Sequence, residues 1–266
     1  MRFCAFASGS SGNCTYAGSE STHILIDVGI SGKRIEEALN GTGLTGRDIR
    51  AILITHEHSD HICGLGVMAR KYGIPIYATE KTIEAIKRDR SVGKVDAGLF
   101  NVVSADNKFM IGDLSINPMK ISHDAADPVG YRIFYGKKKV AVCTDLGKYD
   151  EYTVECLKGL DVVLLEANHD VKMLQTGPYP YPLKQRILSE RGHLSNEASG
   201  QLLSRILHDD MKYVFLGHLS KENNIPELAY EAVRMEVTLS PVNDYRGDDF
   251  CINVAKRSEP SELIAI

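Results

Sequence analysis

The stretch THEHSDH, residues 55–61, decides the fold of this chain. It places three of the nine histidines, together with an aspartate, within six residues. Random placement produces the pattern His-x-His-x-Asp-His in roughly one chain of this length and composition in two thousand. Imidazole and carboxylate groups bind Zn, Mn or Fe ions, and a site without thiolate ligands is more often catalytic than structural. The stretch therefore predicts a catalytic metal site.

The residues around the motif predict how its side chains are arranged. An apolar run at 51–54 predicts a β-strand that ends at the motif. His56 and His58 have the spacing to point the same way from that strand end. Asp60 and His61 then lie in the turn before the next helix and face back from the other side. Four ligands in one loop exceed what one open catalytic ion needs, so the sequence predicts two ions.

Short apolar, β-branched runs alternate with helical segments, which predicts an α/β protein. A series of strands followed by helices occurs twice, and the second series begins between residues 105 and 123. We expect the two halves to form a single domain spanning residues 1–266. The last dozen residues are expected to form a loosely held tail. Strands are predicted at residues 23–26, 51–54, 74–78, 114–121, 129–135, 139–143, 162–165, 213–216 and 250–254. Helices are predicted at residues 32–39, 61–71, 82–90, 153–157, 196–208 and 226–237.

Six of the apolar runs finish in a side chain that can bind a metal ion. Sheet proteins commonly place their sites at the rim where neighbouring strands end, so we expect these side chains to converge. They are Asp27, His56, His123, Asp145, Glu166 and His218.

Composition and charge limit the possible functions. The net charge of -4 and the pI of about 6.1 argue against a protein that coats DNA through a global basic field. The segment MRFCAFASGSSGN lacks the long apolar run of a signal peptide or membrane span. The six cysteines are scattered without a CxxC pair, which predicts reduced thiols. We expect a cytoplasmic protein without membrane association, and the sequence predicts no particular oligomeric state.

The motif, followed by a lone histidine, a lone aspartate and a late histidine at strand ends, resembles the metallo-β-lactamase superfamily. The similarity extends through FASGSSGNC, ILIDVG, THEHSDH, ISHDAADPVGY, CTDLG, LLEANHD, RGHLSNEASG and LGHLSKENN. This longer set resembles the YycJ/WalJ group, which is related to the nuclease and phosphodiesterase branches. The resemblance implies a four-layered αββα sandwich and an exonuclease activity on DNA.

The resemblance also implies a role for individual residues. Asp27 would orient the motif loop through hydrogen bonds. Independently of the resemblance, we expect Glu166 to brace the site and His169 to be either a neighbour of the ligands or a substrate contact. For the two divalent ions (Zn, Mn or Fe), the implied ligands are His56, His58 and His123 on one ion, Asp60, His61 and His218 on the other, and Asp145 between them.

Two metal ions explain why the sequence offers no protein nucleophile. Ions about 3.5–4 Å apart lower the pKa of a bridging water towards about 7, so that hydroxide becomes available to attack a carbonyl or phosphorus. Asp60, beside this water as well as on a metal, is predicted to orient it. The site therefore predicts a hydrolase.

Three weaker signals concern the substrate. His193 precedes Ser195, a predicted helix N-cap, and is either a proton donor and phosphate contact or only a neighbour of the cap. The segment 172–191 interleaves tyrosines with Lys and Arg, which fits a nucleic-acid groove or a stiff Pro-rich loop. The Gly-rich run 8–13 is a hairpin turn that could also form a nest of backbone N–H groups for an anion, with Ser10 and Asn13 near the ions.

The first hypothesis is thus a dinuclear-metal phosphodiesterase, most simply a nuclease with a nucleic-acid substrate, DNA being favoured. The alternative is a hydrolase of a small lactone, thioester or cyclic phosphodiester, which needs the same metal site. A third hypothesis is a metal-bound regulatory or scaffold protein without turnover. The complete ligand set argues against the third, because a decayed site should have lost a carboxylate.

Overall fold

The computed structural model describes all 266 residues, which form two compact units. The first boundary follows Lys120, within the region 105–123 where the break was predicted. That one domain spans the whole chain stays a prediction. The first unit contains Met1–Lys120, Ala125–Lys138 and Lys256–Ile266, and the second contains Ile121–Asp124 and Lys139–Ala255.

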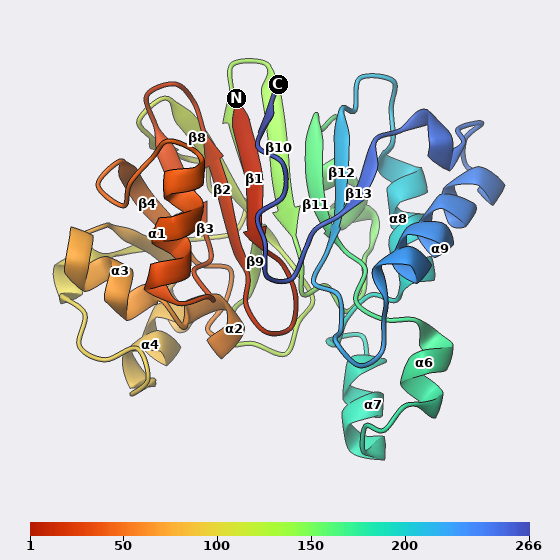
Figure 1. Ribbon diagram of the computed structural model, residues 1–266, viewed down its shortest axis with the longest axis horizontal. Helices are drawn as coiled ribbons and strands as arrows, with labels where there is room; N and C mark the ends of the chain where they lie inside the picture. The colour runs from red at the N-terminus through yellow and green to blue at the C-terminus, as the bar shows by residue number, and fades with distance from the viewer. The chain divides into compact units, whose positions relative to one another are not determined.

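The first unit is built on a seven-stranded mixed sheet with the order β14-β1-β2-β3-β4-β5-β6 (Figure 1). The strands β14, β1, β2 and β3 pair antiparallel, whereas β3, β4, β5 and β6 pair in parallel. The carboxyl ends of β3 to β6 therefore lie at the same edge of the sheet. The strands are β1 (Arg2–Ala7), β2 (Cys14–Gly18), β3 (His23–Ile26), β4 (Ile49–Leu53), β5 (Ile76–Thr79), β6 (Phe100–Val103) and β14 (Ile264–Ala265).

Helices of the first unit contribute apolar side chains to a core shared with this sheet. Ile35 of α1 and Met68 of α3 belong to the same buried cluster as Ile52 of β4 and Ile76 of β5. The helices are α1 (Gly32–Gly41), α2 (Ser59–Ile62), α3 (Leu65–Tyr72) and α4 (Glu80–Arg88), with a short 3₁₀ turn η1 (Ala97–Leu99). The first unit also holds the antiparallel strands β7 (Phe109–Ile111), β8 (Leu114–Lys120) and β9 (Val129–Tyr135).

The second unit contains four strands that pair in parallel, β10 to β13. All five residues of β11 (VVLLE) are buried, as expected for a strand covered on both faces. The helices α8 and α9 lie side by side, and α9 contacts β13 (Figure 1). The strands are β10 (Lys138–Cys143), β11 (Val162–Glu166), β12 (Tyr213–Gly217) and β13 (Ile252–Val254). The helices are α5 (Glu151–Leu157), α6 (Val171–Thr176), α7 (Tyr181–Ile187), α8 (Asn196–Ile206) and α9 (Pro226–Leu239), with η2 (Gly247–Asp249).

Two expectations about local structure were wrong. The helix predicted at 61–71 is interrupted at Cys63 and Gly64, because Gly64 donates its N–H to the Val28 carbonyl and a Cβ there would lie 2.3 Å from the Ile30 oxygen. The last dozen residues are held by pairing of β14 with β1, and the Met1 amino group donates to the Ile266 carbonyl oxygen. No helix combines the length and the apolar character that crossing a membrane requires.

Candidate metal centre

The motif loop follows β4 and holds its histidines close together. His56 Nε2 lies 3.1 Å from His58 Nδ1, and the rings of His56 and His61 have their centroids 4.0 Å apart. His56 and His61 are completely buried. The first unit thus gathers imidazole nitrogens at the end of a parallel strand, as the sequence predicted.

Asp27, directly after β3, is bonded to this loop at several points. Its Oδ1 accepts the Thr55 backbone N–H at 2.9 Å, and its Oδ2 accepts the Thr55 hydroxyl at 2.8 Å and lies 2.8 Å from His61 Nδ1. Because a carboxylate only accepts, His61 Nδ1 carries the proton and its Nε2 carries the lone pair. This geometry is what the predicted orienting role of Asp27 needs, and the role itself stays a prediction.

Thr55 is a contributor that the sequence did not single out. Its hydroxyl donates to Asp27 and also lies 3.0 Å from His56 Nδ1. The hydroxyl proton is used on Asp27, so the oxygen accepts from His56 Nδ1, and the lone pair of His56 is on Nε2. The signal available in the sequence was the position of Thr55, directly before His56 at the end of a predicted strand.

The Gly-rich run 8–13 is the hairpin loop between β1 and β2 and reaches the motif through Asn13. The Asn13 Nδ2 lies 3.1 Å from His61 Nε2 and 3.4 Å from Asp60 Oδ2. Asn13 is buried and Ser10 is exposed, so of these two predicted substrate contacts only Ser10 faces solvent. The predicted nest is wrong for most of the run, because four of its six backbone N–H groups donate to protein acceptors, those of Ser8, Gly9, Gly12 and Asn13.

In the second unit, four strand-end or loop residues surround Asp145. Asp145 Oδ1 lies 3.4 Å from His218 Nε2, 3.7 Å from His123 Nε2 and 3.9 Å from His193 Nδ1. Asp145, Glu166, His193 and His218 each offer one ligand atom within 4.8 Å of the others. Asp145 and His218 follow β10 and β12, which are neighbours of β11, so parallel pairing brings them to one rim.

Hydrogen bonds fix which nitrogen of each ring faces Asp145. His123 Nδ1 lies 3.2 Å from the Gly192 carbonyl oxygen, and His218 Nδ1 lies 2.9 Å from Glu166 Oε1. Both oxygens only accept, so both Nδ1 atoms carry protons and each Nε2 faces the Asp145 carboxylate. In the neutral form of each ring, this Nε2 carries the lone pair that a metal ion needs.

The separations also fit a divalent ion. Ligand atoms about 2.1 Å from one ion in a tetrahedral arrangement lie roughly 3.4 Å apart. The His218–Asp145 distance of 3.4 Å agrees with that value. The donor set of imidazole nitrogens and a carboxylate suits Zn, Mn or Fe, so these residues fit the expected group.

Glu166 is the fully buried anion of this group. Its Oε1 accepts from His193 Nδ1 at 2.8 Å and from His218 Nδ1 at 2.9 Å, and its Oε2 accepts the backbone N–H of Leu146 at 2.7 Å. Burial raises the pKa of the carboxyl, but the two histidines outweigh it and hold the pKa at about 2. Glu166 therefore stays ionised and orients both rings.

Three strand-end residues of the two groups have left-handed backbone conformations. The φ angles are 57° at Asp27, 59° at Asp145 and 56° at His218. Such a conformation costs a non-glycine residue about 1–2 kcal/mol, less for Asp, and strain of this kind gathers at functional sites. The turn aims each side chain at its partners instead of continuing the strand.

His169 contrasts with the other histidines. It is buried, 1% exposed, and neither ring nitrogen has a hydrogen-bond partner. Burial lowers its pKa to about 4, because the imidazolium form is poorly solvated there. His169 thus lies in the interior of the second unit. The predicted contact of His169 with substrate stays a prediction.

The lowered pKa of His169 predicts acid sensitivity. The unfolded chain takes up the proton near pH 6.5 and the folded protein near pH 4, so the free energy of unfolding falls by about 3 kcal/mol as the pH drops between these values. Below pH 4 this group causes no further loss. Urea unfolding in chelator at pH 7 and pH 4.5 should show a smaller loss for His169→Gln than for the unmodified protein. Equal losses of stability in the two proteins would show that protonation of His169 does not cause the acid sensitivity.

The segment 172–191 is helical in part, and Pro178 and Pro180 lie in the non-helical stretch 177–180 between two short helices. It contains α6 and α7, with Pro182 in the first turn of α7, where a missing N–H is tolerated. Several of its cations have local partners: Arg186 pairs with Asp124, Lys184 donates to the Gln175 carbonyl, and Arg191 donates to the His123 carbonyl. Tyr181 is exposed.

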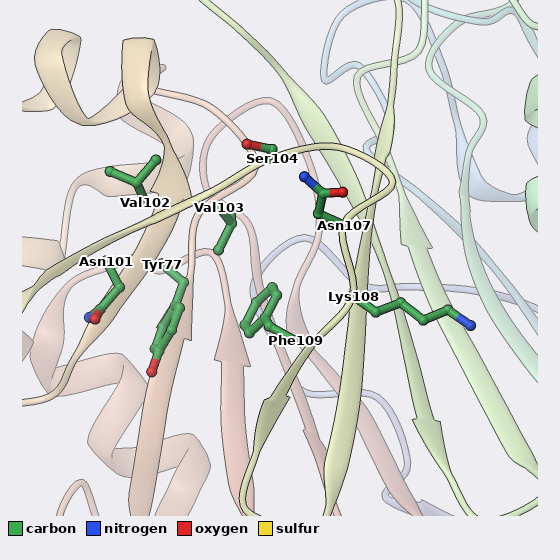
Figure 2. A pocket seen from close by; sticks show the side chains of 8 residues that line it. All are labelled: Tyr77, Asn101, Val102, Val103, Ser104, Asn107, Lys108 and Phe109. Atoms are coloured by element: carbon green, nitrogen blue, oxygen red, sulfur yellow. The ribbon is translucent and has the colours of Figure 1, made fainter.

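A pocket of about 350 Å³ lies apart from the motif loop, between β6 and β7 of the first unit (Figure 2). Tyr77 and Phe109 stack in its wall with ring centroids 5.3 Å apart, and Asn101 and Lys108 also line it. None of its lining residues is His, Cys, Asp or Glu. It therefore lacks metal ligands of its own.

The chain is similar to known proteins over most of its length. Residues 22–215 match the family model described as the beta-lactamase superfamily domain. The chain is 44% identical over 230 residues to the exodeoxyribonuclease WalJ of Streptococcus pneumoniae, covering 86% of each chain. It is 40% identical over 233 residues to the exodeoxyribonuclease YycJ of Bacillus anthracis, covering 88% of each chain.

Solved structures confirm the predicted fold. The metallo-β-lactamase fold protein YhfI of Bacillus subtilis matches with a TM-score of 0.71 at 17% identity, over 98% of both chains. Zn²⁺-bound PqqB of Methylobacterium extorquens matches with a TM-score of 0.72 at 16% identity, over 99% of this chain and 100% of PqqB. With the family match and the two bacterial relatives, these likenesses show that the chain belongs to the metallo-β-lactamase superfamily and is a homologue of WalJ and YycJ.

Proposed function

We propose that the protein is a metal-dependent exodeoxyribonuclease. The observation that carries the proposal is the identity of 40–44% to two exodeoxyribonucleases over 86–88% of the chain. The donor set supports it, because imidazole and carboxylate groups gather at the strand ends of each unit. A cytoplasmic location is part of the proposal, and the six cysteines are free thiols.

The proposed ligands are those that the sequence suggested. In four histidine rings, a hydrogen-bond acceptor holds the proton on Nδ1, so Nε2 is the nitrogen that can bind a metal ion. These rings are His56, His61, His123 and His218. His58 and Asp60 complete the motif loop, and Asp145 is the proposed bridging carboxylate. Bound there, two divalent ions would activate water for attack on phosphorus and stabilise the negative charge that develops.

The chain's own residues supply orientation and proton transfer. Asp60 is proposed to accept a hydrogen bond from the attacking water and so to orient it. His193 is held through Nδ1 by Glu166, which leaves Nε2 to donate a proton to the leaving oxygen of the cleaved phosphodiester. Its side chain is partly exposed, 17%, as contact with a substrate requires. The small-molecule hydrolase remains the alternative outcome of the test.

The test uses purified protein, loaded with Mn or Zn, and end-labelled single- and double-stranded DNA and RNA. We expect metal-dependent shortening of DNA from one end, followed on a sequencing gel. The Asp60→Ala/His61→Ala variant, purified in parallel, should lose at least about a thousandfold of this activity, which excludes a contaminating nuclease. Turnover of a small phosphodiester or lactone with no cleavage of any polymer would contradict the proposal.

A further inference from the structure

The hairpin loop between β1 and β2 connects the motif to the surface. On the inner side of this loop, Asn13 contacts Asp60 and His61. The Asn13 backbone N–H also donates to the Asp60 carbonyl oxygen at 2.8 Å, and the Asn13 side chain binds both the N–H and the carbonyl of Gly9. The position of the loop is therefore fixed relative to two of the proposed metal ligands.

The outer side of the same loop carries a cation from the far end of the chain. Arg257 Nη1 donates to the hydroxyls of Ser10 and Ser11 at 3.3 and 3.4 Å, and both serines are exposed. The C-terminal segment is held here because the Ser8 N–H donates to the Lys256 carbonyl oxygen at 3.1 Å (Figure 1). A Cβ at Gly9 would lie 2.9 Å from Arg257 Nη1, so the glycine leaves room for the guanidinium.

Two further cations lie on the same C-terminal segment or reach it. Lys256 forms an ion pair with Glu259 at 2.7 Å, which cancels both charges locally. Arg34 of α1 donates to the carbonyl oxygen of Ser258, so a second guanidinium reaches the same segment. Four of the loop's six backbone N–H groups already donate to protein acceptors, so an anion here must be bound chiefly by side chains.

We infer that Arg257, with the hydroxyls of Ser10 and Ser11, binds a backbone phosphate of the DNA strand next to the metal centre. A guanidinium beside two hydroxyls matches the geometry and charge of a phosphodiester. Ser10 and Ser11 lie on the same loop as Asn13, which contacts Asp60 and His61. Arg257 therefore engages a phosphate next to the cleaved one and sets the register of the DNA strand. The inference rests on the proposed exodeoxyribonuclease function.

Binding of a fluorescein-labelled oligonucleotide to metal-depleted protein tests this without cleavage. Arg257→Gln should raise the Kd roughly five- to tenfold at about 0.1 M salt and reduce the slope of log Kd against log salt by about one. Arg257→Lys keeps the charge and should retain most of the slope. Lys256→Gln is the matched control: it removes the neighbouring, ion-paired cation and should leave the slope unchanged.

Turnover separates a phosphate contact from a structural role. With metal restored, Arg257→Gln should raise the KM for DNA with little change in kcat, and hydrolysis of bis(4-nitrophenyl) phosphate, which has no flanking phosphates, should be unchanged. An unchanged salt slope in Arg257→Gln, or an equal change in Lys256→Gln, would overturn the inference. DNA binding that depends on Arg257 without any DNA cleavage would overturn the proposed function and leave this contact standing.

Discussion

Asp145→Asn is expected to reduce the metal-dependent activity at least about a thousandfold and to lower the metal content of the purified protein. The carboxylate is the acceptor that the Nε2 atoms of His123 and His218 face, at 3.7 and 3.4 Å. An amide carries no net charge to attract the two proposed divalent ions or to bridge them. Loss of several kcal/mol of charge stabilisation corresponds to a factor of this size.

We expect the substitution to leave the fold intact, so that a loss of activity reports on the metal site. Asn has the shape of Asp and tolerates the left-handed conformation, φ 59°, that residue 145 adopts. When both rings are neutral and no metal is bound, the variant also lacks the carboxylate that faces the Nε2 lone pairs of His123 and His218. Its thermal midpoint in chelator should therefore equal or exceed that of the unmodified protein, and added Mn or Zn should raise it less.

Metal content by mass spectrometry, thermal unfolding with and without metal, and DNA shortening are the measurements. His193→Ala is the matched comparison, because His193 lies beside Asp145 but is proposed to move a proton and not to bind metal. It should keep the metal and lose about 10²–10⁴-fold in rate. Full metal content and full activity in Asp145→Asn would show that the bridging assignment is wrong.

The strand ends show how much of this site the sequence could predict. Asp27 follows β3, the motif follows β4, Asp145 follows β10 and His218 follows β12. Apolar runs bounded by polar side chains are a local pattern, so they could be found without the structure. Parallel pairing then brings the ends to a common edge in each unit. The predicted strands accordingly agree with the structure, apart from their exact ends.

Features that depend on contacts between distant segments could not be predicted in this way. The left-handed turns at Asp27, Asp145 and His218 are held by partners far along the chain, and the modest preference of Asp and His for this conformation does not select these three positions. The proton positions on the rings depend on acceptors such as the Gly192 carbonyl, 69 residues from His123. The helices α6 and α7 were missed because Pro178 and Pro180 stand between them and Pro182 is in the first turn of α7.

Gly29 is another such feature, and Gly29→Ala is expected to have the largest effect on stability. The added Cβ would lie 1.6 Å from the Asp60 carbonyl oxygen and 2.2 Å from its carbon, where contacts of about 3.4 Å are ordinary. The obstacle is backbone, so no side chain can rotate away. The two backbone segments around Gly29 and Asp60 must therefore move apart. Hydrogen bonds oppose this movement, because the Gly29 N–H donates to the Asn13 carbonyl at 2.7 Å and the Val28 N–H donates to the His61 carbonyl at 2.9 Å.

Separation breaks these bonds and displaces Asp60 and His61 from the positions in which Asn13 and Asp27 hold them. We expect the free energy of unfolding to fall by about 3–5 kcal/mol, and the metal affinity of the remaining folded protein to fall at least about a hundredfold. Urea unfolding in chelator measures the first effect, and competition with a metal-binding dye measures the second.

Gly41→Ala is the matched control, since Gly41 is the last residue of α1 and nothing lies within 4 Å of a Cβ there. Alanine at that position should change stability by less than about 1 kcal/mol and leave metal binding unchanged. Because both variants add one methyl group in place of a glycine hydrogen, their difference isolates the close approach of Gly29 to Asp60. If Gly29→Ala unfolded and bound metal like Gly41→Ala, the motif loop could not depend on that approach, and the positions of Asp60 and His61 would need another cause.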